Sequence, residues 1–385
     1  MAEVRPVRDE LESDELRVST LELFFDLVFV FTLTQLTAFL EHELTVLGLS
    51  RVVLVFVILF WMYGGYVWLT NQVPPVRLPR RLLLIIGMAG FLICALAIPD
   101  AFGETGVAFG VGYLVVVLVH GGLFAEARGW VASRFVAPNV VGAVCVIGAG
   151  FTDGWVSAAL WIAPIPLQYL TFWLSQVAQP IYWEGVELRP AHFVERHGLL
   201  LIVAFGESVV AVGIGAGGTT LDVGVVSAAV LGLALAAALW WVYFGNEDER
   251  AVAALTQATP LDRGRIAVNA FFYAFVPMLL GVVIVAAGVV SSLGDVGAVL
   301  TTGPALLLSG GVVLYLLGEA LFRYVLNLRP IAYRLAAALA ALAVLPLGLS
   351  VSAAAQLIGL VLVLTAMLAL EGALARRQDP MGEAV

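Results

Sequence analysis

Long apolar runs, separated by short polar segments, follow one another along most of the chain. A transmembrane helix needs about 20 such residues. The runs lack the apolar–polar alternation that marks the strands of a transmembrane barrel. Because only helices and closed barrels satisfy the backbone inside a bilayer, the pattern predicts an all-α, polytopic transmembrane helical bundle. About twelve helices are expected, near 20–40, 51–70, 82–99, 107–125, 136–151, 155–177, 197–217, 222–244, 266–290, 303–325, 332–350 and 353–374.

The positions of the basic residues indicate how this bundle is inserted. The chain has 19 arginines and no lysine, and only Arg51 follows an odd-numbered apolar run. The others lie near the two ends of the chain or after even-numbered runs. Since cytoplasmic loops carry an excess of Arg and Lys, both termini are predicted to be cytoplasmic. We therefore expect a multi-pass protein of the cell inner (plasma) membrane, with cytoplasmic tails at 1–17 and 375–385.

The second half of the chain also matches the first at four places in the same order. The matching pairs are 24–29 with 205–210, 61–63 with 241–243, 75–80 with 260–265, and 123–124 with 321–322. Such self-similarity suggests a duplicated unit, with copies at 18–180 and 181–374. Because each copy would hold six spans, an even number, the two copies should be parallel. The alternative is chance similarity between apolar helices.

Composition excludes several classes of protein. The chain is 62% hydrophobic and 12% charged, whereas soluble domains carry roughly 25% charged residues, so a soluble domain is excluded. The formal net charge is -9 and no basic block is present, which argues against binding of nucleic acid. Cys94 and Cys145 lie inside apolar stretches, so neither a disulfide framework nor a zinc cluster is expected. No cofactor or metal motif is recognised.

Acidic residues inside the apolar runs need a physical reason, because a carboxylate in the bilayer core costs about 2.5–3.5 kcal/mol or more. Glu22 and Asp26 are four residues apart in the first run, so they share one helix face. Ser19 and Glu22 have the spacing of a capping box. Asp26 lies about 10 Å deeper than Ser19. It either forms an ion pair, with Arg80 or Arg81, or belongs to a site or pathway.

Glu207 is the counterpart of Asp26 in the second half and lies about 16 Å along the helix from Arg196. With Ser208 beside it, Glu207 is the best single candidate for coupling to protons or cations. Arg196 itself is expected at the lipid headgroups, and His120 is expected to be a buried polar partner. Glu319 and Arg323 are four residues apart in the favourable acid-first order, which predicts a local pair within one helix.

Aromatic residues gather near the ends of the second and eighth runs. Tyr63, Tyr243 and Trp241 fit the aromatic belt found at membrane interfaces. The alternative is that these three side chains line a substrate cavity.

Two stretches carry a resemblance to a known family. STLELFFDLVFVFTLTQLT at 19–37 resembles the entry motif of the bacterial low temperature requirement A (LtrA) membrane proteins, and ERHGLLLIVAFGESVVAV at 195–212 resembles their second signature. YLLGEALFR at 315–323 also fits. The family name implies a link to growth in the cold. Phe24, Asp26 and Phe29 are similar, more faintly, to the Phe-Ser-Asp motif of two-repeat potassium channels.

These features favour a channel or secondary transporter for a small ion or solute, with Asp26 and Glu207 as coupling or gating groups. One alternative is an integral-membrane enzyme that acts on a lipid or isoprenoid by acid catalysis. The other is a structural or sensory membrane protein in which every buried acid is paired. The lipid bilayer is the expected partner in each case, and an enzymatic activity is the less favoured reading.

Overall fold

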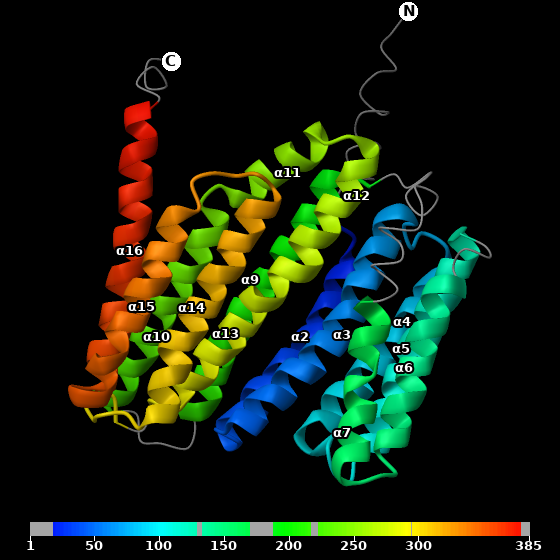
Figure 1. The fold of residues 1–385 in the computed structure, drawn as a ribbon, viewed down its shortest axis with the longest axis horizontal. Coiled ribbons are helices and arrows are strands. Elements are labelled where there is room, and N and C mark those ends of the chain that lie inside the picture. Colours follow the sequence, from blue (N-terminus) through cyan, green and yellow to red (C-terminus); the bar gives the residue numbers. More distant parts are fainter. Residues whose placement is uncertain (1–17, 129–132, 170–187, 217–221, 294, 379–385) are drawn as a thin grey trace, which may run out of the picture. The chain divides into compact units, whose positions relative to one another are not determined.

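A computed structural model describes residues 18–128, 133–169, 188–216, 222–293 and 295–378 of the chain. Every regular element in these ranges is helical (Figure 1). The elements are α2 Thr20–His42, α3 Val46–Gln72, α4 Leu78–Ala97, η1 Ile98–Asp100, α5 Gly106–Arg128, α6 Ser133–Ala149, α7 Gly154–Ile162, α9 Pro190–Ala216, α10 Val223–Phe244, α11 Glu247–Gln257, α12 Pro260–Val268, η4 Asn269–Ala274, α13 Phe275–Val290, α14 Thr302–Val325, α15 Ala332–Ser350 and α16 Ala353–Gln378.

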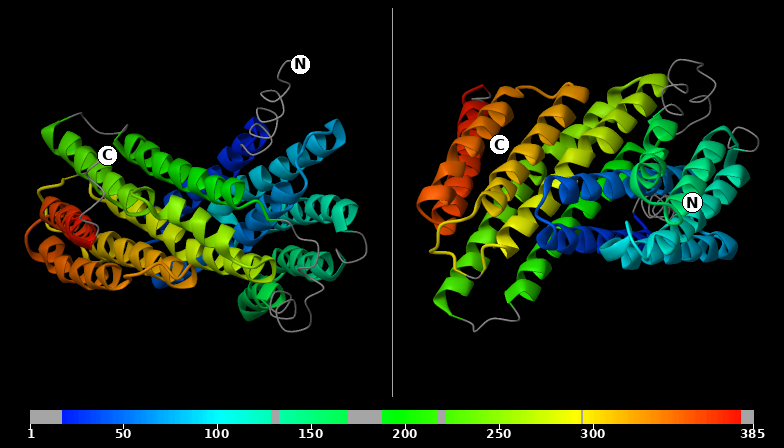
Figure 2. Two further views of the ribbon diagram at one scale, coloured as in Figure 1. Left: turned by 90° about the horizontal axis from the view of Figure 1, so that it is seen from above. Right: turned by 60° about the horizontal axis from the view of Figure 1, so that its bottom comes forward.

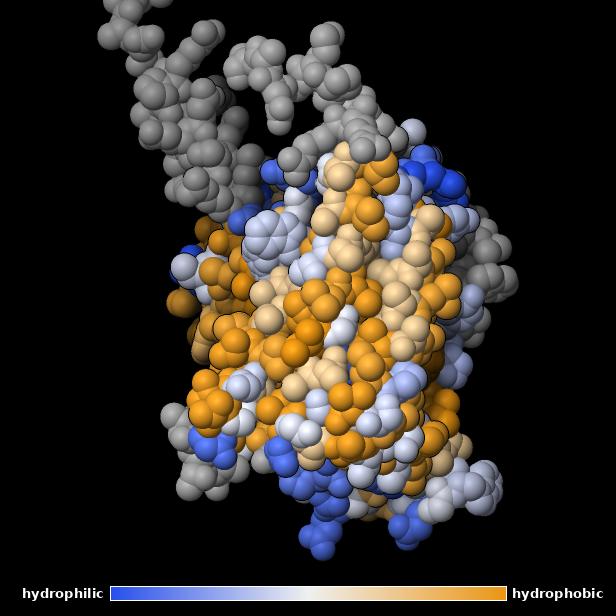
Figure 3. Space-filling view, turned by 90° about the vertical axis from the view of Figure 1, so that its left-hand side faces the viewer, coloured by the Kyte–Doolittle hydropathy of each residue, from blue (hydrophilic) through white to orange (hydrophobic). Residues whose placement is uncertain are grey.

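Ten helical stretches in the described ranges are long and apolar enough to cross a membrane, and each coincides with a predicted span. The other two predicted spans, 136–151 and 155–177, correspond to shorter helices. Of these, α6 has 17 residues and α7 has 9, and part of the second span lies outside the described residues. One face of the molecule carries a broad hydrophobic band, with hydrophilic residues gathered at both ends (Figure 3). The chain is thus a multi-pass helical membrane protein.

The chain folds as two compact units, and neither unit is one continuous segment. The first, called unit 1 here, contains Met1–Gln35, Leu54–Val203 and Ala251–Val268. Unit 2 contains Leu36–Val53, Ala204–Arg250 and Asn269–Val385. The helices α2, α3 and α9 each contribute residues to both units.

Small residues allow the helices of unit 1 to pack closely. A Cβ atom on Gly90 of α4 would lie 2.9 Å from the carbonyl oxygen of Gly112 on α5. A Cβ on Gly110 would lie 2.7 Å from the backbone nitrogen of Ile147 on α6. Small residues at such crossings let helix backbones approach each other, so α4, α5 and α6 form a tightly packed layer.

Unit 2 is built in the same way around α13, of which almost every residue is buried. A Cβ on Gly281 would lie 2.7 Å from the carbonyl oxygen of Gly311 on α14. The contacts continue from α14 to α15, from α15 to α16 and from α16 to α10, and the yellow-to-red helices lie side by side in both views of Figure 2.

The segment before α13 is a π-helix, Asn269–Ala274. Pro277 follows it in the first turn of α13. Proline has no backbone N–H, and its ring clashes with the carbonyl four residues earlier, here that of Tyr273. The wider helical turn therefore lies where the proline disrupts the regular hydrogen-bond pattern.

Candidate functional site: a buried carboxylate–arginine cluster

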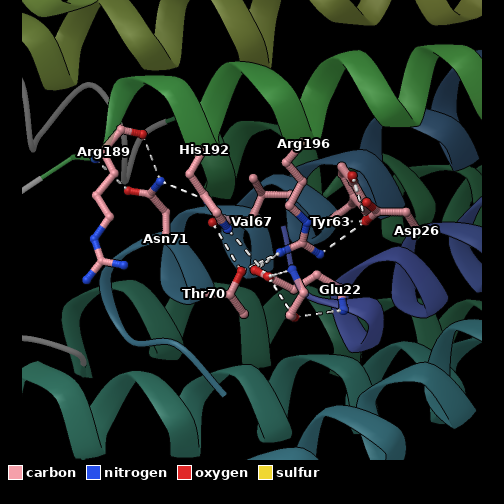
Figure 4. Close-up of polar contacts among 10 residues, drawn as sticks. Glu22, Asp26, Tyr63, Val67, Thr70, Asn71, Arg189, His192 and Arg196 are labelled. Carbon is pink, nitrogen blue, oxygen red and sulfur yellow. Dashed lines mark hydrogen bonds and ion pairs between the residues drawn. The ribbon is translucent and has the colours of Figure 1, made fainter. Parts of the chain in front are cut away.

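A cluster of buried polar side chains joins three helices of unit 1 (Figure 4). The side chains come from helices that are far apart in the sequence: α2, α3 and α9. Most of them are almost fully removed from solvent. The members of this cluster are Glu22, Asp26, Tyr63, Thr70, Asn71, His192 and Arg196.

The cluster begins at the first turn of α2, where the predicted capping box is confirmed. The backbone N–H of Glu22 donates to Oγ of Ser19 at 3.3 Å, and the backbone N–H of Ser19 donates to Oε2 of Glu22 at 3.0 Å. This reciprocal bonding satisfies two N–H groups that the helix itself leaves free. Glu22 is only 3% exposed. The carboxylate that caps α2 therefore lies inside the protein, where it also contacts α9.

Arg196 of α9 is the cation of the cluster. Its guanidinium donates to Glu22 Oε1 at 3.0 Å and to Asp26 Oδ1 at 3.1 and 3.4 Å, and it also contacts the hydroxyl of Thr70. The guanidinium also lies 5.6 Å from the ring centroid of Phe25, within cation–π range. Arg196 is 1% exposed, so its predicted place at the lipid headgroups is wrong.

Of the two alternatives for Asp26, the buried ion pair is present, but its partner is neither Arg80 nor Arg81. Arg80 forms a salt bridge with Glu126 at 2.8 Å, and Nε of Arg81 donates to the carbonyl of Pro75. Asp26 is instead matched from α9, which supplies the buried guanidinium of Arg196. A partner 170 residues away could not be identified from sequence spacing.

Tyr63 of α3 donates its hydroxyl to Oδ1 of Asp26 at 2.9 Å. Tyr63 is fully buried, so it is an internal hydrogen-bond donor and not part of an interfacial aromatic belt. All the hydrogen bonds to Asp26 converge on Oδ1. The second carboxylate oxygen, Oδ2, is buried and has no hydrogen-bond partner among the described residues.

Asn71 fixes the tautomer of His192, the other polar residue of α9 in the cluster. The Asn71 amide accepts from the backbone N–H of Arg189 at 3.0 Å and donates to the carbonyl of Arg189 at 3.1 Å. Its remaining N–H points to Nδ1 of His192, 3.1 Å away. Nδ1 must therefore accept, which leaves Nε2–H to donate to Glu22 Oε2 at 3.4 Å. His192 is accordingly neutral in this arrangement.

The charges of the cluster do not balance. Glu22 and Asp26 supply two carboxylates, whereas Arg196 supplies the one guanidinium that bonds to them. Since His192 is neutral, one negative charge is left over if both acids are ionised. A buried, uncompensated charge is costly, so the cluster favours uptake of one cation or proton. Oδ2 of Asp26, the oxygen without a partner, is the atom best placed to receive a proton.

Other predicted site residues lie elsewhere. Glu207 and Ser208 are half-buried in unit 2. Among the described residues Glu207 makes no side-chain hydrogen bond or ion pair, while Ser208 donates to the carbonyl of Ala204 at 3.1 Å. Trp241 is 60% exposed, as expected of a belt residue, but Tyr243 is fully buried. His120 is half-buried between the rings of Tyr66 and Phe124 in unit 1.

A second polar cluster lies in unit 2, and the predicted pair of Glu319 and Arg323 is part of it. These two side chains approach to 3.7 Å. Arg323 bonds more closely to Glu247 of α11 and Glu371 of α16, and Arg334 of α15 also bonds to Glu371. Glu247 and Glu371 were not identified from the sequence as members of a site, so this cluster was only partly predicted.

Comparison with known proteins identifies the family of the chain. Residues 17–369 match the family described as bacterial low temperature requirement A protein (LtrA). The chain belongs to the LtrA family. This LtrA protein is 28% identical over 320 residues to the uncharacterized protein RA0937 of Rhizobium meliloti (strain 1021), which covers 80% of this chain and 77% of that protein. No solved structure matches the chain. These matches do not support the fainter similarity to potassium channels.

The two LtrA-like stretches of the sequence meet in the cluster of unit 1. The first, 19–37, contains Glu22 and Asp26, and the second, 195–212, contains Arg196. Residues Thr70, Asn71 and His192 were not identified from the sequence as members of a site. The signal that could have found them is their polarity at the ends of two apolar helices.

Proposed function

We propose that this LtrA protein is a secondary transporter or channel for a small ion or solute, and that Asp26 is its coupling group. The observation that carries the proposal is the surplus carboxylate of the unit 1 cluster, with Oδ2 of Asp26 buried and unpartnered. Polar groups buried within membrane spans most often serve ion pathways or proton relays.

In this proposal Asp26 alternates between an ionised and a neutral state. When Asp26 carries a proton or a bound cation, Glu22 and Arg196 balance each other and the cluster is closed. When Asp26 is ionised, the surplus charge favours an arrangement in which water or a second ion reaches Oδ2. Because Asp26 is fully buried here, exchange requires a movement that loosens the contact of α9 with α2 and α3. The predicted duplication, with six spans in each half and both termini in the cytoplasm, would supply two halves for such a movement.

Purified protein in liposomes loaded with a pH-sensitive dye tests this proposal. Imposed gradients of protons, potassium or sodium should drive a dye response in the wild type and not in Asp26→Asn. Asparagine keeps an oxygen that accepts from Tyr63 and Arg196, and it removes the surplus charge, so thermal stability should be unchanged or higher. Glu126→Gln is the matched control, because Glu126 forms a half-exposed pair with Arg80. Equal flux in Asp26→Asn and the wild type would refute the role of Asp26.

The same flux assay compares Glu207, the best single candidate from the sequence, with Asp26. If Glu207 also couples transport, Glu207→Gln should lower flux although the described residues give its carboxylate no ion pair. If only Asp26→Asn loses flux, the cluster of unit 1 alone carries coupling.

An apolar pocket gives one observation in favour of the enzyme alternative. Its volume is about 290 Å³, and α9, α10 and α13 of unit 2 line it with residues that include Phe205, Ser208 and Gly232. Such a pocket suits a lipid tail or an isoprenoid, but no carboxylate lines it, so the buried acids are not placed for acid catalysis there. A lipid that co-purifies stoichiometrically, detected by mass spectrometry, would favour this alternative.

A further inference from the structure

Glu319 of α14 is a buried carboxylate of unit 2 that makes no hydrogen bond with the described residues. It is fully buried, and neither of its oxygens has a hydrogen-bond partner among the described residues. Its nearest cation is Nε of Arg323, 3.7 Å from Oε1, which is too far for a hydrogen bond. The hydroxyl of Tyr243, on the neighbouring helix α10, is also buried and has no hydrogen-bond partner among the described residues.

The closer ion pairs around Glu319 do not include it. Arg323 bonds to both Glu247 and Glu371, while Arg334 bonds to Glu371 and lies 3.9 Å from Glu247. Two carboxylates and two guanidiniums therefore form a square, of which the side between Arg334 and Glu247 is the longest. Arg250 adds a third guanidinium, which bonds to Glu247. If Glu319 were ionised, it would be a third negative charge beside this square, and Nε of Arg323 would be expected to move into bonding distance.

In the described part of the chain, the remaining helices around α14 supply no further buried cation. The helix contacts α10, η4, α13, α15 and α16. α13 carries no charged or titratable residue, and the titratable residue of η4 is Tyr273. α14 itself adds Tyr315, whose hydroxyl donates to the carbonyl of Leu239. Arg250 bonds to Glu247 at 3.3 Å from a side chain that is 38% exposed, so it acts on the solvent side of the square.

A pocket brings solvent to the other side of this square. Its volume is about 540 Å³, and its lining includes Glu247, Arg323, Arg334 and Glu371. The exposed residues Glu249 and Arg329 also line it, so the pocket opens to the surface. The groups that separate Glu319 from the pocket are therefore themselves polar and hydrogen-bonded.

The π-helix η4 packs against the same turn of α14. The ring of Phe271 lies 5.2 Å from that of Phe322, and a Cβ on Gly318 would lie 3.0 Å from the carbonyl oxygen of Ala274. Single turns of π-helix occur frequently at functional sites. An irregular backbone therefore faces the helix turn that carries Glu319.

We propose that Glu319 is a second proton-binding site, which holds a proton in this conformation and exchanges it with water in the 540 Å³ pocket. A proton fits better than a metal ion, because the described residues contain no group of three or more His, Cys, Asp or Glu side chains that could hold a metal. The exchange is a simple protonation: the proton comes from water, binds a carboxylate oxygen and returns to water.

Infrared difference spectroscopy of the full-length protein in nanodiscs tests this proposal. At neutral pH the wild type should show the C=O stretch of a protonated carboxyl group that is missing in Glu319→Gln. Glu43→Gln is the control, because Glu43 is a part-exposed partner of Arg51 in the same unit, and it should keep the band. In D₂O the band should shift as the proton exchanges with the pocket.

Two results would overturn the inference. The first is a full carboxylic-acid band in Glu319→Gln, which would mean that the proton is elsewhere. The second is a Glu319 band that does not exchange in D₂O, which would mean that the pocket does not reach it. Both readouts are independent of transport. A carboxylic-acid band that is lost only in Asp26→Asn would concern unit 1 alone. Failure of this inference and failure of the proposed function are therefore distinguishable.

Discussion

Replacing Arg196 with glutamine tests whether the cluster of unit 1 holds the fold together. The substitution removes a guanidinium that makes four hydrogen bonds, to Glu22, Asp26 and Thr70. It leaves two carboxylates, 3% and 0% exposed, without their cation. Removing one partner of a buried ion pair typically costs about 3–5 kcal/mol, because the charge left behind is uncompensated.

Arg80→Gln is the matched control for this substitution. Arg80 also pairs with a glutamate, at 2.8 Å, but its side chain is 21% exposed and that of Glu126 is 47% exposed. Exposed pairs contribute only about 0–1 kcal/mol, since water solvates both charges when the pair is broken. The two variants thus compare the same chemistry in a buried and in an exposed setting.

Thermal unfolding in nanodiscs, followed by intrinsic tryptophan fluorescence at one scan rate, measures the difference. A fixed rate is needed because large membrane proteins often unfold irreversibly. Arg196→Gln should melt clearly below Arg80→Gln, and adding Asp26→Asn to Arg196→Gln should recover part of the loss, because the two sites are coupled. If Arg196→Gln melts together with Arg80→Gln, the reasoning from buried charge is refuted.

Three further substitutions test individual contacts by the same melting assay. Ser19→Ala removes the N-cap of α2 and should cost about 0.5–2 kcal/mol, whereas Ser19→Thr should restore the cap; no loss in the alanine variant would contradict the capping box. Asn71→Ala should cost about 1 kcal/mol for each hydrogen bond lost, and a wild-type melt would show that the amide is dispensable. Gly281→Ala should cost about 1–3 kcal/mol, because its Cβ would lie 2.7 Å from a backbone oxygen, while Gly310→Ala, with nothing within 4 Å, should have little effect.

The sequence predicted the features that depend on local composition. Ten of the twelve predicted spans coincide with helices that are long and apolar enough to cross a membrane, because hydrophobicity over about 20 residues is a local property. The capping box of Ser19 and Glu22 and the pair of Glu319 and Arg323 were also found, because each lies within one or two helical turns. The burial of Asp26 followed from its depth in the first run.

Partners from distant helices could be identified only from the tertiary structure. Arg196 lies at the start of a helix, where a cation is usually solvated, and only the packing of α9 on α2 turns it into the buried counterion of Asp26. Glu247 and Glu371 were not identified from the sequence, yet the helices of unit 2 bring them together around Arg323. Spacing along a chain reports which residues share a helix face; which faces meet depends on packing. The atoms that packing leaves without partners, on Asp26 and Glu319, are the ones on which the proposed proton chemistry rests.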